Sequence, residues 1–284
     1  MLRASAKEHP LDTADTPRFE AMTTGMLLDR AFRLYTNNFS LMLGIAAAAY
    51  VPFYLIMLVI EASLSGRLQS PTGGLSMLLF QVVFMILWAS IAFPVASGAA
   101  TFAISERYLG NEVGIVDALQ RGLSHFWTLS LAQITATIRV LFGFILLIIP
   151  GILWMLSYSL VVPAILVEGH KAMPGLRRSR DLVKGYRGKI FLVMIVINLL
   201  QAVLAGGVGV VSSFLLTSDA GATAVLSSAL GNLLSILLTP LGIIAAILLY
   251  YDMRIRKEGF DLEMLSLAVS TQSPAAATTA ILSR

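Results

Sequence analysis

Arg139 places a charged side chain inside a long apolar run of this sequence. It precedes Pro150 by 11 residues, so on a helix that rises about 1.5 Å per residue it lies roughly 16 Å into a bilayer. A charge at that depth costs at least about 2.5 kcal/mol, so we expect the guanidinium to face the protein interior beside a polar partner or water. The candidate partners are Gln133, Asn198, Gln201 and Asn232. With Arg139 they form a predicted intramembrane site for an anion or a lipid headgroup. The alternative is that Arg139 extends to a membrane surface.

The largest cluster of charge is a basic run that directly precedes another apolar segment. It comprises Arg177, Arg178, Arg180, Lys184, Arg187 and Lys189. Each cation close to an anionic leaflet adds about 1 kcal/mol of attraction. We therefore predict contact with anionic lipid headgroups or with an acidic membrane protein partner. The alternative is that these residues only fix the orientation of the chain in the membrane.

Residues suited to catalysis or metal binding are scarce. The chain has no cysteine, and its three histidines are far apart and belong to no metal-binding motif. The sequence contains no Ser/His/Asp grouping and no P-loop, and its GGVGVV segment lies inside an apolar run with no strand before it. We therefore predict no catalytic residue, no metal, no cofactor and no enzymatic activity. A nucleic-acid partner is not expected either, because the basic residues flank apolar segments.

The composition requires lipid around most of the chain. Hydrophobic residues make up 57% of the sequence and charged residues only 13%, whereas a soluble domain carries about a quarter charged residues. Six windows approach or exceed the roughly 20 apolar residues that cross a bilayer. They cover residues 40–60, 76–103, 128–149, 152–167, 190–211 and 224–250. The predicted fold class is an all-α polytopic membrane protein with about six transmembrane helices.

Short amphipathic segments precede the first, third and fifth windows. The first turns Leu28, Ala31, Phe32, Tyr35 and Phe39 to one side, the second turns Val116, Leu119, Leu123 and Phe126 together, and the third is the basic run. Each is typical of a helix lying at a membrane surface. The pattern suggests three repeated units of one interfacial helix and one helical hairpin. Pro150 and Gly151 predict a tight turn between windows three and four.

The distribution of Lys and Arg predicts orientation. With a cytoplasmic N-terminus, 18 of the 20 basic residues lie in inside segments, Arg67 lies outside and Arg139 lies within a span. Both termini are therefore expected in the cytoplasm. We expect residues 1–24 to be a flexible tail, 25–265 the six-helix membrane domain and 266–284 a disordered tail.

Three segments resemble a known family. They are LLDRAFRLYTNNF, LLIIPGILWMLSYSLVVPAILVEGHKAMPGLRRSRDLVKGYRGKIF and LLYYDMRIRKEGFDLEML. Together, across about residues 25–265, they resemble the glycerophosphoryl diester phosphodiesterase membrane domain of bacterial proteins. The resemblance implies a location in the bacterial cytoplasmic (inner) membrane. In the enzymes that name the family a separate catalytic barrel follows, and that barrel is absent from this chain.

Two functions remain open at this point. The first is a non-enzymatic scaffold, regulator or lipid-contacting factor whose partners are membrane lipids. The alternative is a transporter or lipid-moving protein with a site near Arg139. A dry bundle around Arg139 favours the first, and a polar-lined cavity open to one face favours the second.

Overall fold

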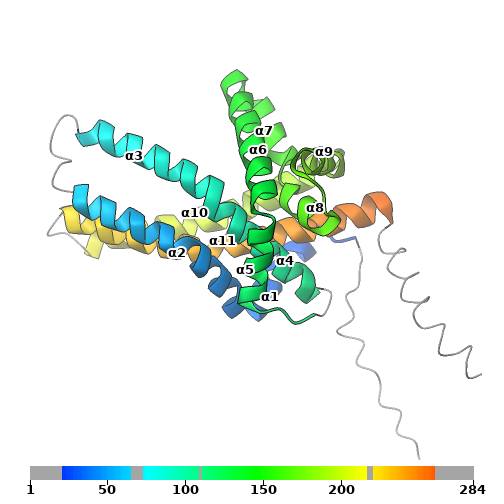
Figure 1. The fold of residues 1–284 in the computed structure, drawn as a ribbon, viewed down its shortest axis with the longest axis horizontal. Coiled ribbons are helices and arrows are strands. Elements are labelled where there is room, and N and C mark those ends of the chain that lie inside the picture. The colour runs from blue at the N-terminus through cyan, green and yellow to red at the C-terminus, as the bar shows by residue number, and fades with distance from the viewer. Residues whose placement is uncertain (1–20, 65–72, 109–110, 216–219, 260–284) are drawn as a thin grey trace, which may run out of the picture.

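The structure is a computed structural model that describes residues 21–64, 73–108, 111–215 and 220–259. Every regular element in these ranges is helical (Figure 1). The elements are α1 (Thr24–Asn37), α2 (Phe39–Leu64), α3 (Gly73–Leu87), the π-helix η1 (Trp88–Ala92), α4 (Phe93–Tyr108), α5 (Ile115–Ser124), α6 (Phe126–Leu146), α7 (Ile148–Ser157), α8 (Val161–Glu168), α9 (Ala172–Val183), α10 (Arg187–Leu215) and α11 (Ala220–Glu258). Residues 1–20, most of the predicted N-terminal tail, and residues 260–284, which include the whole predicted C-terminal tail, lie outside this part.

The helices confirm the predicted class, an all-α polytopic membrane protein. Among the described residues, five segments are long and apolar enough to cross a bilayer: Phe39–Ile60, Phe126–Leu146, Ile148–Glu168, Arg187–Leu204 and Ala229–Glu258. The remaining predicted window, 76–103, falls on the consecutive elements α3, η1 and α4.

Near two of the prolines, side-chain hydroxyls from neighbouring helices donate to backbone carbonyls. Pro94 cannot donate to the carbonyl of Ser90, which lies in η1, and the hydroxyl of Ser130 on α6 donates to that oxygen instead at 2.9 Å. Just before Pro240 in α11, the carbonyl of Leu237 accepts from the Tyr35 hydroxyl at 2.6 Å. These bonds tie α6 to η1 and α1 to α11.

The three predicted amphipathic helices are present, and α1 buries two residues of its predicted apolar side, Ala31 and Tyr35, whereas the buried residues of α5 lie outside its predicted apolar group. On α1 the buried side chains are Leu27, Ala31 and Tyr35, whereas Phe32 is exposed. On α5 the small residues Ala118 and Gly122 are buried. The backbone at Gly122 lies so close to α4 that a Cβ there would be 2.8 Å from the Val95 carbonyl. On α5 small residues therefore make the protein contact, and the larger side chains of Val116 and Leu123 remain available to lipid.

Residues just before α1 belong to the folded domain, although the sequence placed them in the tail. The side chain of Thr23 accepts from the Met26 amide as the N-cap of α1. The amide of Met22 donates to Asp252 at 2.7 Å. The membrane domain therefore begins by residue 22.

The hairpin of α6 and α7 confirms that windows three and four are antiparallel neighbours, but its turn lies earlier than expected. Leu147 alone is extended between the two helices, and Pro150 sits in the first turn of α7. Gly143 and Gly151 bring the backbones together, since a Cβ on Gly143 would lie 2.9 Å from the Gly151 Cα.

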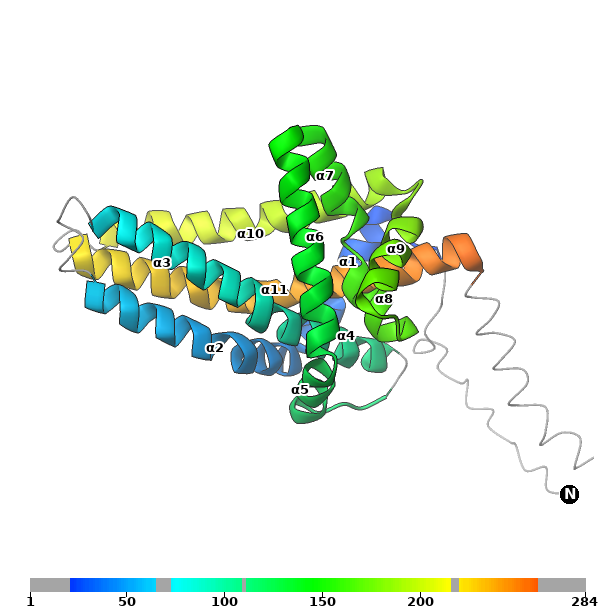
Figure 2. The ribbon, with the colours of Figure 1, turned by 45° about the horizontal axis from the view of Figure 1, so that its top comes forward.

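This hairpin runs across the long helices rather than alongside them. Helices α2, α3, α10 and α11 share one general direction, with α11 packed against α2, α4 and α10, while α6 and α7 cross that direction in both views (Figures 1 and 2). An amphipathic helix followed by two helical segments occurs three times in the described part of the chain, as the repeat scheme requires. The orientation of the second pair departs from the other two.

Candidate functional site

A partly open cavity of about 620 Å³ lies among α4, α6, the α7–α8 segment, α10 and α11. Its wall is mostly apolar, and Gln133, Asn198 and Gln201 contribute polar groups to it. The structure thus brings together three of the five residues predicted for the intramembrane site. Asn232 belongs to α11, and its side chain lies outside the described part of the chain.

Each of the two side-chain amides on α10 uses one N–H in a hydrogen bond to a backbone carbonyl. Asn198 Nδ2 donates to the Met194 carbonyl at 2.7 Å, and Gln201 Nε2 donates to the Leu238 carbonyl at 3.1 Å. Each side chain still has an oxygen acceptor and a second N–H. These groups can therefore bind the polar part of a ligand.

The partner of Arg139 differs from the candidates named by the sequence. Its Nη1 donates to the hydroxyl of Tyr158 at 3.2 Å, and its guanidinium carbon lies 5.8 Å from the centre of that ring. Arg180 Nη2 donates to the same hydroxyl at 2.9 Å. Two guanidinium groups from α6 and α9 therefore meet at one phenol oxygen, and Tyr158 also lines the cavity.

Tyr158 holds this position because the fourth predicted span is broken. Helix α7 ends at Ser157 and α8 begins at Val161. The fully buried Ser179 of α9 joins the break, since its hydroxyl donates to the Ser157 carbonyl at 2.8 Å and accepts from the Leu160 amide at 3.2 Å. The next residue along α9 is Arg180, which is thereby placed against Tyr158.

The contact with Arg180 also places Arg139 beside the basic helix α9. The sequence estimate assumed that α6 runs along the bilayer normal, whereas α6 crosses the long helices (Figure 2). Arg139 shares its acceptor with Arg180 of α9, the basic amphipathic helix. Arg139 therefore lies beside the basic helix α9 and on a hairpin that crosses the long helices.

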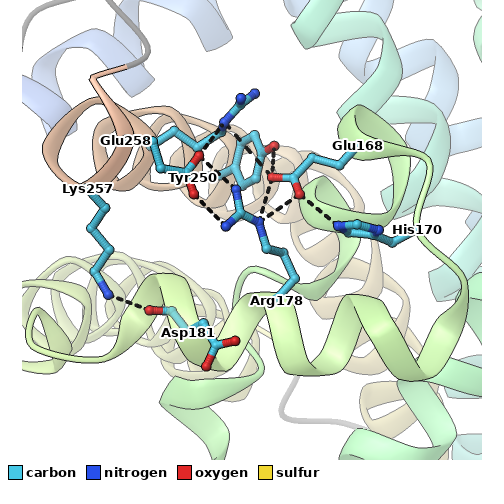
Figure 3. Close-up of polar contacts among 8 residues, drawn as sticks. Glu168, His170, Arg178, Asp181, Tyr250, Lys257 and Glu258 are labelled. Atoms are coloured by element: carbon cyan, nitrogen blue, oxygen red, sulfur yellow. Dashed lines mark hydrogen bonds and ion pairs between the residues drawn. The ribbon is translucent and has the colours of Figure 1, made fainter.

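Arg178, in the middle of the basic run, is committed to an internal ion-pair network. Figure 3 shows it between two carboxylates: Nε lies 2.7 Å from Glu168 and Nη1 lies 2.5 Å from Glu258. The hydroxyl of Tyr250 donates to Glu168 at 2.7 Å, and His170 lies 2.8 Å from the same carboxylate. Hydrogen bonds to Glu258 and Glu168 raise the pKa of Arg178 above its usual range, despite its partial burial. This arrangement ties α8, α9 and α11 together.

Lys189 and Arg187 also make contacts inside the protein. Lys189 Nζ lies 2.5 Å from the carboxylate of Asp252 and 2.5 Å from the Met22 carbonyl. Arg187 Nη2 lies 3.5 Å from Ser157 Oγ, while its buried Nε has no hydrogen-bond partner among the described residues. The run is therefore a set of helix-to-helix contacts as well as a basic surface.

Three members of the basic run, Arg177, Arg180 and Lys184, remain exposed, and Arg180 is the one that contacts Tyr158. The side chains of Arg177 and Lys184 reach solvent or lipid headgroups, and neither forms an ion pair within the described ranges. They are the members best placed for the predicted surface contact with anionic lipid or a partner.

Among the described residues, no group of three His, Asp or Glu side chains could hold a metal ion. No curated protein and no solved structure matches the chain. Over residues 112–251 the chain matches the model of a family described as a domain of unknown function (DUF7847). The matched stretch runs from α5 to near the end of α11. It contains Arg139, Tyr158, Arg180 and the three amides that line the cavity.

Proposed function

We propose that this chain is a non-enzymatic, lipid-binding protein of the bacterial cytoplasmic membrane that holds a membrane lipid in the cavity between α6, α10 and α11. The observation that carries the proposal is the cavity itself. Its volume of about 620 Å³ falls within the range of small-molecule sites. A mostly apolar wall with a few amide and hydroxyl groups suits acyl chains joined to a polar headgroup.

The surroundings of the cavity favour a ligand that arrives from the bilayer. Leu141 and Phe144 of α6 line the cavity and are also exposed on the outer surface of the protein. In a membrane that surface contacts lipid tails. A lipid could therefore enter sideways without leaving an apolar environment.

The proposed orientation has both termini in the cytoplasm. Its support is the basic balance of the sequence, in which 18 of 20 Lys and Arg residues fall on one side. The resemblance to the glycerophosphoryl diester phosphodiesterase membrane domain remains part of the proposal and is the reason for the bacterial inner membrane as the location.

A lipid-moving protein is the second candidate, and the irregular helices around the cavity favour it. The α7–α8 break and the π-helix η1 both contribute residues to the cavity wall. Interrupted helices beside a site are a feature of many transporters. Reconstitution into vesicles with a fluorescent phospholipid separates the two functions, because only a lipid-moving protein accelerates exchange between leaflets.

Native mass spectrometry of the purified full-length protein tests lipid binding. Ala246 lines the cavity, so Ala246→Phe should fill space that the lipid occupies and lower the bound fraction at least several-fold. The matched control is Ala202→Phe, because Ala202 is exposed on α10. Equal lipid occupancy in the two variants and the unaltered protein would rule out the cavity as the binding site.

A further inference from the structure

The two arginines at Tyr158 have a charge that the described part of the protein does not balance. Arg139 and Arg180 both donate to the Tyr158 hydroxyl, at 3.2 and 2.9 Å. A neutral phenol accepts these bonds but supplies no negative charge. Neither guanidinium forms an ion pair with a carboxylate of the described residues. Two like charges are thus held close together without a counter-ion.

Two other clusters in the described part of the protein pair cations with acids. Arg178 bridges Glu168 and Glu258, and Lys189 shares the buried carboxylate of Asp252 with Arg256. Arg30 and Arg107 are also half-buried without an ion pair among the described residues, so the missing acid alone does not single out Tyr158. What distinguishes this place is that two guanidinium groups converge on one neutral oxygen. An external anion would complete the site in the way that Glu168 and Asp252 complete the others.

Arg187 adds a third guanidinium at the same break in the chain. Its Nη2 is 3.5 Å from the hydroxyl of Ser157, the residue before Tyr158, and its buried Nε has no hydrogen-bond partner among the described residues. A guanidinium group holds its N–H donors in one plane, so two neighbouring donors can bind two oxygens of the same phosphate. Donors remain available on all three side chains.

We propose that Arg139, Arg180 and Arg187 bind the phosphate group of an anionic lipid whose acyl chains occupy the cavity. The inference rests on the proposed function and adds the headgroup that the site selects. Tyr158 connects the two parts, because it receives the arginine hydrogen bonds and also lines the cavity. The basic amphipathic helix α9 is of the kind that lies at a membrane surface, which is the level of a lipid phosphate.

The experiment compares two ligands with identical chains. Dioleoylphosphatidylglycerol carries an anionic phosphate, whereas dioleoylglycerol has none. Dissociation constants for both are measured by native mass spectrometry on the full-length protein in detergent. We expect the phosphate lipid to bind about tenfold or more tightly, the discrimination that one or two charge-assisted hydrogen bonds provide.

Equal affinities in the unaltered protein would overturn the phosphate site while leaving lipid binding intact. Binding of neither lipid would remove the proposed function as well.

Variants then assign the preference to these side chains. Arg139→Gln with Arg180→Gln should bring the affinity for the phosphate lipid down to that for dioleoylglycerol, which itself should not change. Arg177→Gln with Lys184→Gln removes the same charge at exposed positions and should keep most of the preference. Retention of the full preference in the first pair, or its loss in the second, contradicts the proposal. If the first pair does not fold, Arg139→Lys and Arg180→Lys keep the charge but lose the planar donors, and each should still weaken phosphate discrimination.

Competition with inorganic phosphate shows whether the arginines bind the phosphate of a lipid or free phosphate. A lipid phosphate gains additional affinity from its chains in the cavity, so free phosphate at the same concentration should not displace the bound lipid. Displacement at equal concentration would assign the arginines to free phosphate and overturn the lipid headgroup.

Discussion

Lys189 of α10 donates a hydrogen bond of 2.5 Å to Asp252 of α11, a carboxylate with no exposed surface. The same carboxylate accepts from the Met22 amide at 2.7 Å and from Arg256 at 3.1 Å. Lys189 and Arg256 also donate to the Met22 carbonyl. One buried acid thus holds the segment before α1 against two of the longest helices.

Removing this acid should destabilise the protein strongly. Asp252→Ala leaves Lys189 and Arg256 facing each other without their shared partner, a change that costs about 3–5 kcal/mol when the pair is buried. The control is Asp29→Ala, since the Asp29–Arg33 pair is more than 60% exposed on both sides and contributes at most about 1 kcal/mol. Unfolding in detergent, followed by circular dichroism, compares the two. Similar losses for both variants would show that Asp252 does not anchor the fold.

Substitution by lysine should lower the stability of the protein at Arg178 of α9 but not at its neighbour Arg177. Arg178 contacts two carboxylates with separate nitrogens, which a lysine cannot reproduce, so Arg178→Lys should lower stability by about 1–3 kcal/mol. Arg177 is exposed, and Arg177→Lys should change stability by less than about 0.5 kcal/mol. Thermal unfolding of both variants measures the difference. A stable Arg178→Lys protein would mean that the network in Figure 3 contributes little.

The helices were predictable because their signals are local. An apolar run long enough to cross a bilayer forms a helix since no other structure satisfies its backbone there, and α2, α10 and α11 follow their windows closely. The amphipathic segments likewise gave α1, α5 and α9. The face that each helix buries was less predictable, because Gly122 packs against α4 by virtue of its small size rather than its hydrophobicity.

The contacts of the site depend on tertiary structure that the sequence pattern does not contain. Tyr158 meets Arg139 and Arg180 across 19 and 22 residues and from three different elements. A tyrosine in an apolar run gives no indication of such a partner. One signal was present, however: Ser157, Tyr158 and Ser159 place three polar side chains in succession within the shortest window. That run marks the break between α7 and α8.

The exposure of the cations in the basic run was also not predictable from the sequence pattern. Counting cations identified the cluster, but whether a cation faces solvent depends on acids far along the chain. Glu258 lies 80 residues from Arg178, and Asp252 lies 63 residues from Lys189. Only the packing of α9 and α10 against the end of α11 brings these pairs together.

A methyl group at Gly143 should separate the two helices of the α6–α7 hairpin. The Cβ of Gly143→Ala would lie 2.9 Å from the Gly151 Cα and 3.0 Å from its nitrogen, and backbone atoms cannot move aside as a flexible side chain does. We expect a loss of about 1–3 kcal/mol. Gly206→Ala is the control, because a Cβ there meets nothing within 4 Å, and the better helix former should be neutral or stabilise α10 by up to about 1 kcal/mol. Unfolding midpoints that move equally would contradict the close helix contact.

The crossing direction of the α6–α7 hairpin leads to an expectation about its tip. Leu147, Ile148 and Ile149 are each about 70% exposed, so they require an apolar environment around them. If the long helices define the bilayer normal, the tip points sideways into lipid rather than toward the outer face (Figure 2). A hairpin that spanned the membrane twice would instead present Leu147 at that face.

Single cysteines distinguish these two positions, and the chain has no native cysteine to interfere. We expect Leu147→Cys to resist a membrane-impermeant maleimide in intact cells and in inside-out vesicles, and to react once the membrane is dissolved in denaturing detergent, because the thiolate forms only in contact with water. Lys184→Cys should react only in inside-out vesicles, and Ser65→Cys, in a segment that the sequence places outside, should react in intact cells. Labelling of Leu147→Cys in intact cells would establish that the hairpin crosses the bilayer. The cavity would then open at a greater depth than the level of α9.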